Sequence, residues 1–218
     1  MTYFDDETFA FLRELRRHNE REWFNENKER YERSVKEPLL QFIADVGPQL
    51  KKISPSLVAD PRPVGGSMFR IYRDVRFSKD KSPYKTHAGA HFSSGGSMAG
   101  PGYYLHVAPG DSFMAGGMWM PDPAVLQKIR ERISQRPSDW KKARDTLDDT
   151  EEVLKRPPRG FEPDDPMIED IKRKSFTGSV PLSESQMKRA DLTTTFNRGC
   201  REILPLMRFL AAAAGVRW

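Results

Sequence analysis

The residues best suited to chemistry lie in one stretch, FRIYRDVRFSKDKSPYKTH, from Phe69 to His87. It holds six basic and two acidic side chains, a net charge of 6 − 2 = +4 in a chain whose formal net charge is +5. Arginine binds carboxylate or phosphate through two parallel hydrogen bonds, and lysine adds a mobile point charge. The stretch therefore predicts a site for a small phosphate- or carboxylate-bearing ligand. The candidate ligand-binding residues are Arg70, Tyr72, Arg73, Asp74, Arg76, Lys79, Lys81, Tyr84, Lys85 and His87.

The first half of this stretch, Phe69–Phe77, has the alternation of a β-strand. Its apolar side chains fall on one face and its polar side chains on the other. Arg73 falls on the apolar side, where an unpaired guanidinium is costly. A bulge could turn it outward, which we favour, or an acid such as Glu22 or Glu26 could reach it from the amino-terminal helices. Residues 78–83 then predict a polar turn.

A second hypothesis is a metal-dependent enzyme of phosphoryl or nucleotide chemistry. Asp74 and Asp80 would hold a divalent ion while the basic side chains hold phosphate. Each aspartate is flanked by bases, however, so structural ion pairs explain both residues at least as well. The sequence contains no Walker loop, GxGxxG, GxSxG or HExxH motif. No catalytic residue and no cofactor can be named on these grounds.

Three histidines, His87, His91 and His106, fall close together and invite a metal hypothesis. On an extended strand His87 and His91 share a face but lie about 13 Å apart at about 3.3 Å per residue, too far for one ion. One of them would have to meet His106 on a neighbouring strand, with a carboxylate added. We therefore predict no metal site and treat the histidines as polar sheet residues.

Aromatic side chains are interleaved with the basic ones. Tyr72 and Tyr84 are candidates for stacking against a ligand, whereas Phe77 and Trp119 are assigned to the core. The bases are too compact, and too often interrupted by aspartate, for a track along a polymer. Any binding to nucleic acid is expected to be weak and salt-sensitive, although the sequence pI is near 9.3.

A third hypothesis is a protein-interaction module without catalysis. Its docking segment would be Arg156–Phe161, which is rich in proline and reads as extended and exposed. The sequence does not determine the oligomeric state.

The basic stretch, together with FAFLRELRRHNEREWF near the start and YYLHVAPGDSFMAGGMW later on, resembles the family named domain of unknown function 2461 (DUF2461). The resemblance runs from about Phe9 to Leu210. It implies one domain of mixed α and β structure, and no established activity, cofactor or catalytic residue comes with it.

The elements that must position these residues indicate an α+β fold. Helical periodicity dominates residues 5–52 and 122–213, and strand alternation dominates 67–120, within a single domain spanning 1–218. We expect a curved antiparallel sheet of about five strands in a meander, with helices from both ends covering one face. The expected strands are Phe69–Phe77, His87–Phe92, Tyr103–Val107, Ser112–Met120 and Ser175–Leu182.

Composition places this chain of 218 residues among polar, foldable globular proteins. Cys200 is its only cysteine, so no intrachain disulfide is expected, and its place on an apolar helical face predicts a buried, inert thiol. Asp5, Asp6 and Glu7 stand where a signal peptide would need positive charge. No apolar run is long enough to span a bilayer. We expect a cytoplasmic protein without a membrane.

Overall fold

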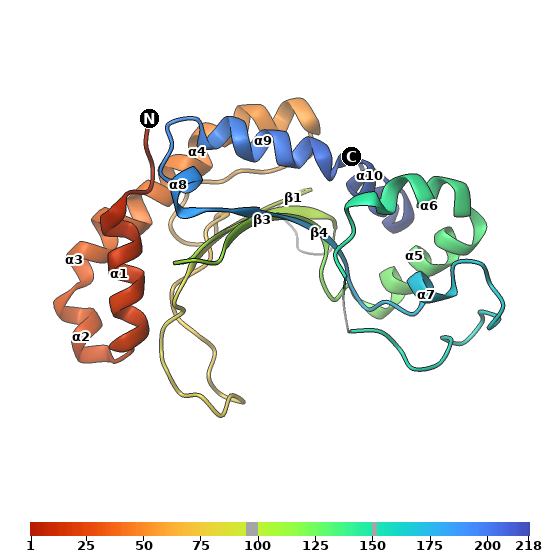
Figure 1. Ribbon diagram of the computed structural model, residues 1–218, viewed down its shortest axis with the longest axis horizontal. Coiled ribbons are helices and arrows are strands. Elements are labelled where there is room, and N and C mark those ends of the chain that lie inside the picture. Colours follow the sequence, from red (N-terminus) through yellow and green to blue (C-terminus); the bar gives the residue numbers. More distant parts are fainter. Residues whose placement is uncertain (95–99, 150–151) are drawn as a thin grey trace.

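The computed structural model describes residues 1–94, 100–149 and 152–218 (Figure 1). The helical elements are α1 Asp6–Arg17, α2 Arg21–Glu26, α3 Lys28–Tyr31, the π-turn η1 Glu32–Lys36, α4 Glu37–Ile53, α5 Pro123–Gln135, α6 Pro137–Ala143, the 3-10 turn η2 Arg144–Thr146, α7 Ile168–Ile171, α8 Glu184–Met187, α9 Leu192–Glu202 and α10 Leu204–Ala214. The strands are β1 Ala88–Ser93, β2 Gly102–Val107, β3 Ser112–Met118 and β4 Phe176–Leu182.

The sheet confirms the predicted α+β class with antiparallel pairing. Its order is β1-β2-β3-β4, and each strand runs antiparallel to its neighbours. Turn residues Ala108–Asp111 join β2 to β3, whereas α5, α6 and α7 lie in the long connection from β3 to β4. The connection expected between β1 and β2 falls partly on residues 95–99, which lie outside the described residues.

Alternation along the strands separates two sheet faces with different surroundings. Tyr103, Leu105 and Met114 belong to the face under α4 and α9, and all three are fully buried. The hydroxyl of Tyr103 donates to the Cys200 carbonyl of α9 at 2.7 Å. A Cβ on Gly199 would lie 2.1 Å from the Met114 sulfur, so glycine lets α9 approach β3 this closely.

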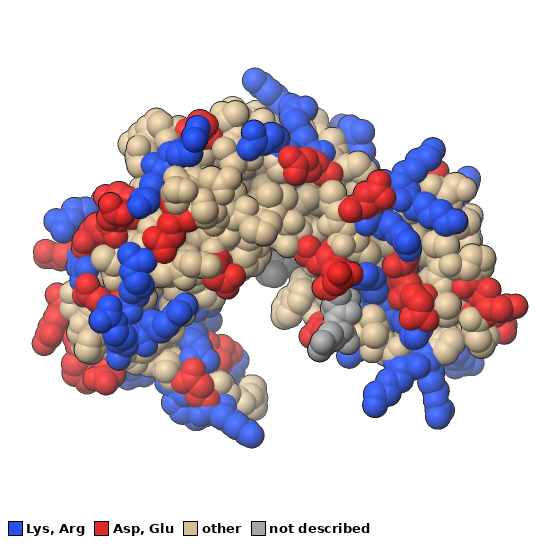
Figure 2. Space-filling view, in the orientation of Figure 1, with Lys and Arg blue, Asp and Glu red and all other residues tan. Residues whose placement is uncertain are grey.

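The opposite face of the sheet is concave. At one end α1, α2 and α3 extend past the sheet, and at the other end α5, α6 and α7 do the same (Figure 1). Helices therefore lie on both sides of the sheet, and the expectation that they cover one face only is wrong. Figure 2 shows the hollow that remains beneath the sheet between these two ends.

The strand predicted over Phe69–Phe77 is absent, so within the described residues the sheet has four strands, not about five. In place of a ladder, the backbone in and beside this segment makes isolated bridges, Met68 with Ala90 and Tyr72 with Tyr84. Pro83 occupies the returning limb, and its lack of an N–H breaks any ladder with this segment. Residues 69–87, here called the basic arm, therefore leave the sheet as an extended loop (yellow in Figure 1).

Two aromatic residues assigned to the core are at the surface instead. Phe77 is 95% exposed and Trp119 is 74% exposed. Phe77 follows the alternation of the basic arm, but the arm has left the sheet there and no layer covers that side. Trp119 follows Met118 at the end of β3, and the alternation that buries Met118 places Trp119 on the opposite, partly exposed side.

The amino-terminal helix cap and the single cysteine have the environments that the sequence predicts. Asp5 caps α1, since its carboxylate accepts the backbone N–H of Thr8 at 3.0 Å. Cys200 is fully buried, and burial raises the pKa of its thiol. Among the described residues, no helix combines the length and apolar character that crossing a membrane requires.

Candidate functional site: a basic pocket beside the concave sheet face

The basic arm is held against the corner between α1 and α2. The side-chain amide of Asn19 donates to the Tyr84 carbonyl and accepts the Tyr84 N–H, both at 3.0 Å. The buried Tyr84 ring stacks on Phe24 of α2 with centroids 4.1 Å apart. Within the arm, the N–H of Arg73 donates to Pro83 and that of Lys85 to Ile71. Docking to helices therefore takes the place of sheet pairing.

This docking forms a pocket of about 360 Å³, here called the basic pocket. Its lining combines three cationic side chains, one carboxylate, one imidazole and several hydrogen-bonding groups. The lining residues are Arg16, Asn19, Arg73, Asp80, Ser82, Tyr84, Lys85, Thr86 and His87.

The strand pattern placed Arg73 on the apolar side of the segment. The structure gives it a partner that is neither solvent reached through a bulge nor an acid of the amino-terminal helices. Its guanidinium forms an ion pair with Asp80 and donates to the Ser82 carbonyl at 3.2 Å. Ser82 donates to Asp80 from both its hydroxyl and its N–H, and with Arg73 these bonds hold the Asp80 pKa below its usual range. Arg73 therefore pairs within the arm, and Glu22 and Glu26 are not its partners.

Lys85 lines the basic pocket and also contacts two other residues of the basic arm. Its ammonium donates to the Arg70 carbonyl at 2.8 Å and sits 5.4 Å from the Phe69 ring centroid. Burial, followed by repulsion from Arg70, lowers the Lys85 pKa below 10.5. A partly desolvated ammonium is a strong attractor for an incoming anion.

The remaining members of the predicted site lie outside the basic pocket. Asp74 forms a bidentate pair with Arg76 at 2.9 and 2.7 Å, and that pair lowers the Asp74 pKa. Lys81 donates to the Val75 carbonyl at 2.9 Å, and Lys79 is exposed. Arg70 is exposed and contributes its backbone carbonyl to Lys85.

Tyr72 lines a second pocket, of about 250 Å³, which shares Arg73 and Tyr84 with the basic pocket. Its ring lies 5.5 Å from the Tyr84 ring, and 53% of the residue is exposed. Of the ten predicted residues, the structure therefore brings Arg73, Tyr84, Lys85 and His87 together in the basic pocket, while Tyr72 lies beside it.

His87 links the basic pocket to the concave sheet face. Its ring lies 4.2 Å from that of His106, which stacks on Phe113 at 4.7 Å. Burial, then His106 and Lys85, lower the His87 pKa to about 4. Burial also lowers the pKa values of His91 and His106. Imidazoles with lowered pKa values are neutral at pH 7 and can act as hydrogen-bond donor and acceptor.

Tyr104 completes this group. Its hydroxyl lies 2.9 Å from Nδ1 of His106, and burial raises the Tyr104 pKa to about 12. His91 pairs directly with Tyr104 across β1 and β2. Within the described ranges, no three His, Cys, Asp or Glu side chains are arranged to hold a metal ion.

The family model described as conserved hypothetical protein (DUF2461) matches residues 7–209. The chain belongs to the DUF2461 family. No curated protein and no solved structure matches it. The basic pocket of this DUF2461 chain lies wholly within the matched span, as does the concave sheet face.

Sequence reasoning did not place Arg16 and Asn19 in this region of the DUF2461 chain. Both lie far before the basic arm along the chain, and His106 was considered only as a metal partner of His87 or His91. The arginine count near the end of α1 and the polar residues alternating in β2 were available signals. Neither signal specifies which distant segment will dock there, because that depends on tertiary contacts.

Proposed function

We propose that this protein binds a small phosphate- or carboxylate-bearing ligand in the basic pocket. The observation that carries the proposal is the convergence of Arg16, Arg73 and Lys85 from two distant segments onto one concavity. With Asp80 as the only carboxylate in the lining, the pocket has a charge of 3 − 1 = +2. Arg73 already pairs with Asp80, so Arg16 and Lys85 are the cations best placed to meet an added anion.

The neutral groups of the basic pocket suit the same ligand. Ser82, Thr86 and the Asn19 amide offer uncharged polar groups, and His87 offers an imidazole. Mixed charged and neutral donors are typical of sites that surround a phosphate or carboxylate from several sides. The compact lining supports a single small anion. For nucleic acid we still expect weak binding that falls steeply with salt.

The hypothesis of a metal-dependent enzyme has less support. It requires Asp74 or Asp80 to be available for a divalent ion, but Asp74 is paired with Arg76, and Asp80 with Arg73 and Ser82. Removing either carboxylate from its pair would leave a guanidinium without its partner.

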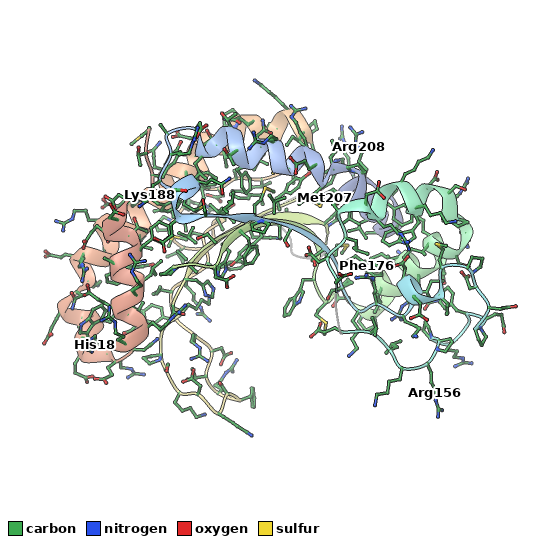
Figure 3. The ribbon with its side chains drawn as sticks, viewed as in Figure 1. His18, Arg156, Phe176, Lys188, Met207 and Arg208 are labelled. Carbon is green, nitrogen blue, oxygen red and sulfur yellow. The ribbon has the colours of Figure 1, made fainter. Side chains whose placement is uncertain are left out.

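The Arg156 segment of the interaction hypothesis lies at the far end of the molecule and points outward (Figure 3). That hypothesis remains a separate proposal.

The test is calorimetric titration of the full chain with inorganic phosphate and sulfate at low salt. We expect saturable binding that weakens about tenfold in Lys85→Gln and in Arg16→Gln, because each variant removes one charge-assisted contact. Arg17→Gln is the matched control. Arg17 is the next residue of the same helical turn, is exposed like Arg16, and does not line the basic pocket.

Arg76→Gln provides a second control within the basic arm. Arg76 is exposed and paired with Asp74 outside the pocket. If all four variants bind phosphate equally well, or if Arg17→Gln and Arg76→Gln weaken binding as much as the pocket variants, the attraction is a general surface charge effect and the proposed site is wrong.

A further inference from the structure

The concave sheet face carries a group of rings that the proposed anion site does not use. We call Phe69, His91, Tyr104, His106 and Phe113 the ring platform. Each of the five is partly buried and partly exposed. They belong to the sheet face opposite the one that packs on α9, or, for Phe69, to the arm beside it. This is the face that borders the hollow seen in Figure 2.

The rings of the platform contact one another in sequence. Phe69 lies 6.3 Å from His91 and 5.9 Å from Tyr104. Tyr104 lies 5.8 Å from His106 and 5.9 Å from Phe113. Such centroid separations are those of interacting aromatic pairs, so the rings hold one another in place.

Two glycines let the rings lie along the sheet. A Cβ at position 102 would lie 2.3 Å from Nε2 of His91, and one at position 89 would lie 2.5 Å from the Tyr104 hydroxyl. His91 therefore covers Gly102 of β2, and Tyr104 covers Gly89 of β1. Because glycine has no side chain, a ring that lies over it can pack flat against the neighbouring strand and does not project from the sheet.

We infer that the ring platform binds a planar heteroaromatic ring whose attached phosphate occupies the basic pocket, as in a mononucleotide. This inference rests on the proposed function and extends it from an anion to a ligand class. Stacking on aromatic and imidazole faces is how proteins hold nucleobases. The hydroxyl of Tyr104 and the ring nitrogens of His91 and His106 add hydrogen-bonding groups, which suit a heterocycle better than a hydrocarbon ring.

The two sites are adjacent, which limits the ligand size. His87 lines the basic pocket and contacts His106 of the platform at 4.2 Å between ring centroids. Lys85 likewise lines the pocket and lies 5.4 Å from the Phe69 ring. One small molecule can therefore place a phosphate against Lys85 while its ring rests on the platform. No separate domain movement is needed to join the two sites.

The experiment titrates the full chain with adenosine monophosphate, adenosine and inorganic phosphate in parallel. We expect the nucleotide to bind at least about tenfold more tightly than phosphate, the gain that one stacked base supplies. Phe113→Leu removes a platform ring and keeps apolar volume, so it should reduce nucleotide affinity to the level of phosphate without changing phosphate affinity. Phe77→Leu is the matched control, because Phe77 is 95% exposed on the basic arm and outside the platform.

A second variant keeps the inference testable if Phe113→Leu does not fold properly. Ala115 pairs with Tyr104 across β2 and β3 on the same concave face and is partly exposed. Ala115→Leu adds bulk above the platform and removes nothing from the core. It should obstruct the ring of the nucleotide and leave phosphate binding intact.

The outcomes separate the two proposals. Equal affinities for nucleotide and phosphate in the unmodified chain would overturn the ring inference and leave the anion site standing. Adenosine binding that is lost in Phe113→Leu, without any phosphate binding, would support the platform and overturn the proposed anion site. If none of the three compounds binds, both proposals are wrong.

Discussion

Asn19 and Tyr84 are 65 positions apart, yet the side-chain amide of Asn19 occupies both backbone hydrogen-bonding groups of Tyr84. An asparagine amide can imitate a neighbouring strand in this way, since it offers a donor and an acceptor side by side. The contact fixes the returning limb of the basic arm to the helical corner. Through that limb it also fixes the adjacent Lys85 in the pocket that Arg16 lines.

Replacing Asn19 should therefore loosen the arm. In Asn19→Ala both backbone groups of Tyr84 lose their partner, and we expect the free energy of unfolding to fall by about 1–3 kcal/mol. Trypsin should also cleave the arm faster at Lys79 and Lys81, both of which are exposed. Urea denaturation and timed digestion followed by mass spectrometry measure the two effects. Asn25→Ala, an exposed position in the neighbouring helix α2, is the control and should change neither.

The lowered pKa of His87 predicts a pH dependence of stability. Its pKa falls from 6.5 to about 4 in the folded chain, so the unfolded chain binds the extra proton first as pH decreases. The stabilisation is fully present above pH 6.5 and is lost as pH falls from 6.5 to about 4. Over this pH window the free energy of unfolding should fall less in His87→Asn than in the unmodified chain, and we expect the difference to be on the order of 2 kcal/mol.

Chemical denaturation at several pH values measures this difference. His18→Asn is the matched control, because it makes the same substitution at an exposed position at the end of α1. A His87→Asn variant with the same pH slope as the unmodified chain would contradict the assignment.

A buried carboxylate organises the opposite end of the molecule. Asp170 is 6% exposed and accepts the Trp140 indole N–H at 2.7 Å while pairing with Arg144 and Arg173. Asp170→Asn keeps the shape but removes the charge, so it should lower the free energy of unfolding by about 3 kcal/mol. Urea denaturation measures it. Asp139→Asn, an exposed acid on α6, should change stability by less than about 1 kcal/mol. If Asp170→Asn and Asp139→Asn lower the free energy of unfolding equally, the ion pairs of Asp170 do not stabilise the fold.

Close backbone contact makes Gly178 of β4 intolerant of a side chain. A Cβ there would lie 2.2 Å from the Thr146 carbonyl oxygen, which is backbone and cannot rotate away. Gly178→Ala should therefore lower the melting temperature and cost about 1–3 kcal/mol. Gly100→Ala is the control, since its nearest atom would be a Val216 methyl at 3.6 Å. Calorimetric melting curves that coincide for the two variants would argue against this close contact.

The strands show where pattern reasoning succeeds and where it stops. Residues near 88–93, 102–107, 112–118 and 176–182 were all expected as strands, and each has a neighbour whose backbone completes its hydrogen bonds. Phe69–Phe77 alternates in the same way but lies in a loop. Alternation reports which side chains tend to be buried, whereas a strand also requires a continuous partner, and the returning limb with Pro83 does not provide one.

The candidate site likewise has features that the local sequence predicts and features that depend on tertiary contacts. The sequence by itself determined the α+β class, the resemblance to DUF2461, the buried Cys200 and the concentration of basic residues in 69–87, because composition and short-range periodicity are properties of the chain alone. Only the tertiary structure decided that Arg16 and Asn19 line one pocket with Lys85, that Asp80 pairs with Arg73, and that the His87 ring lies against that of His106. Packing of helices against the arm, and of the arm against the sheet, selects among many pairings that the local sequence allows equally.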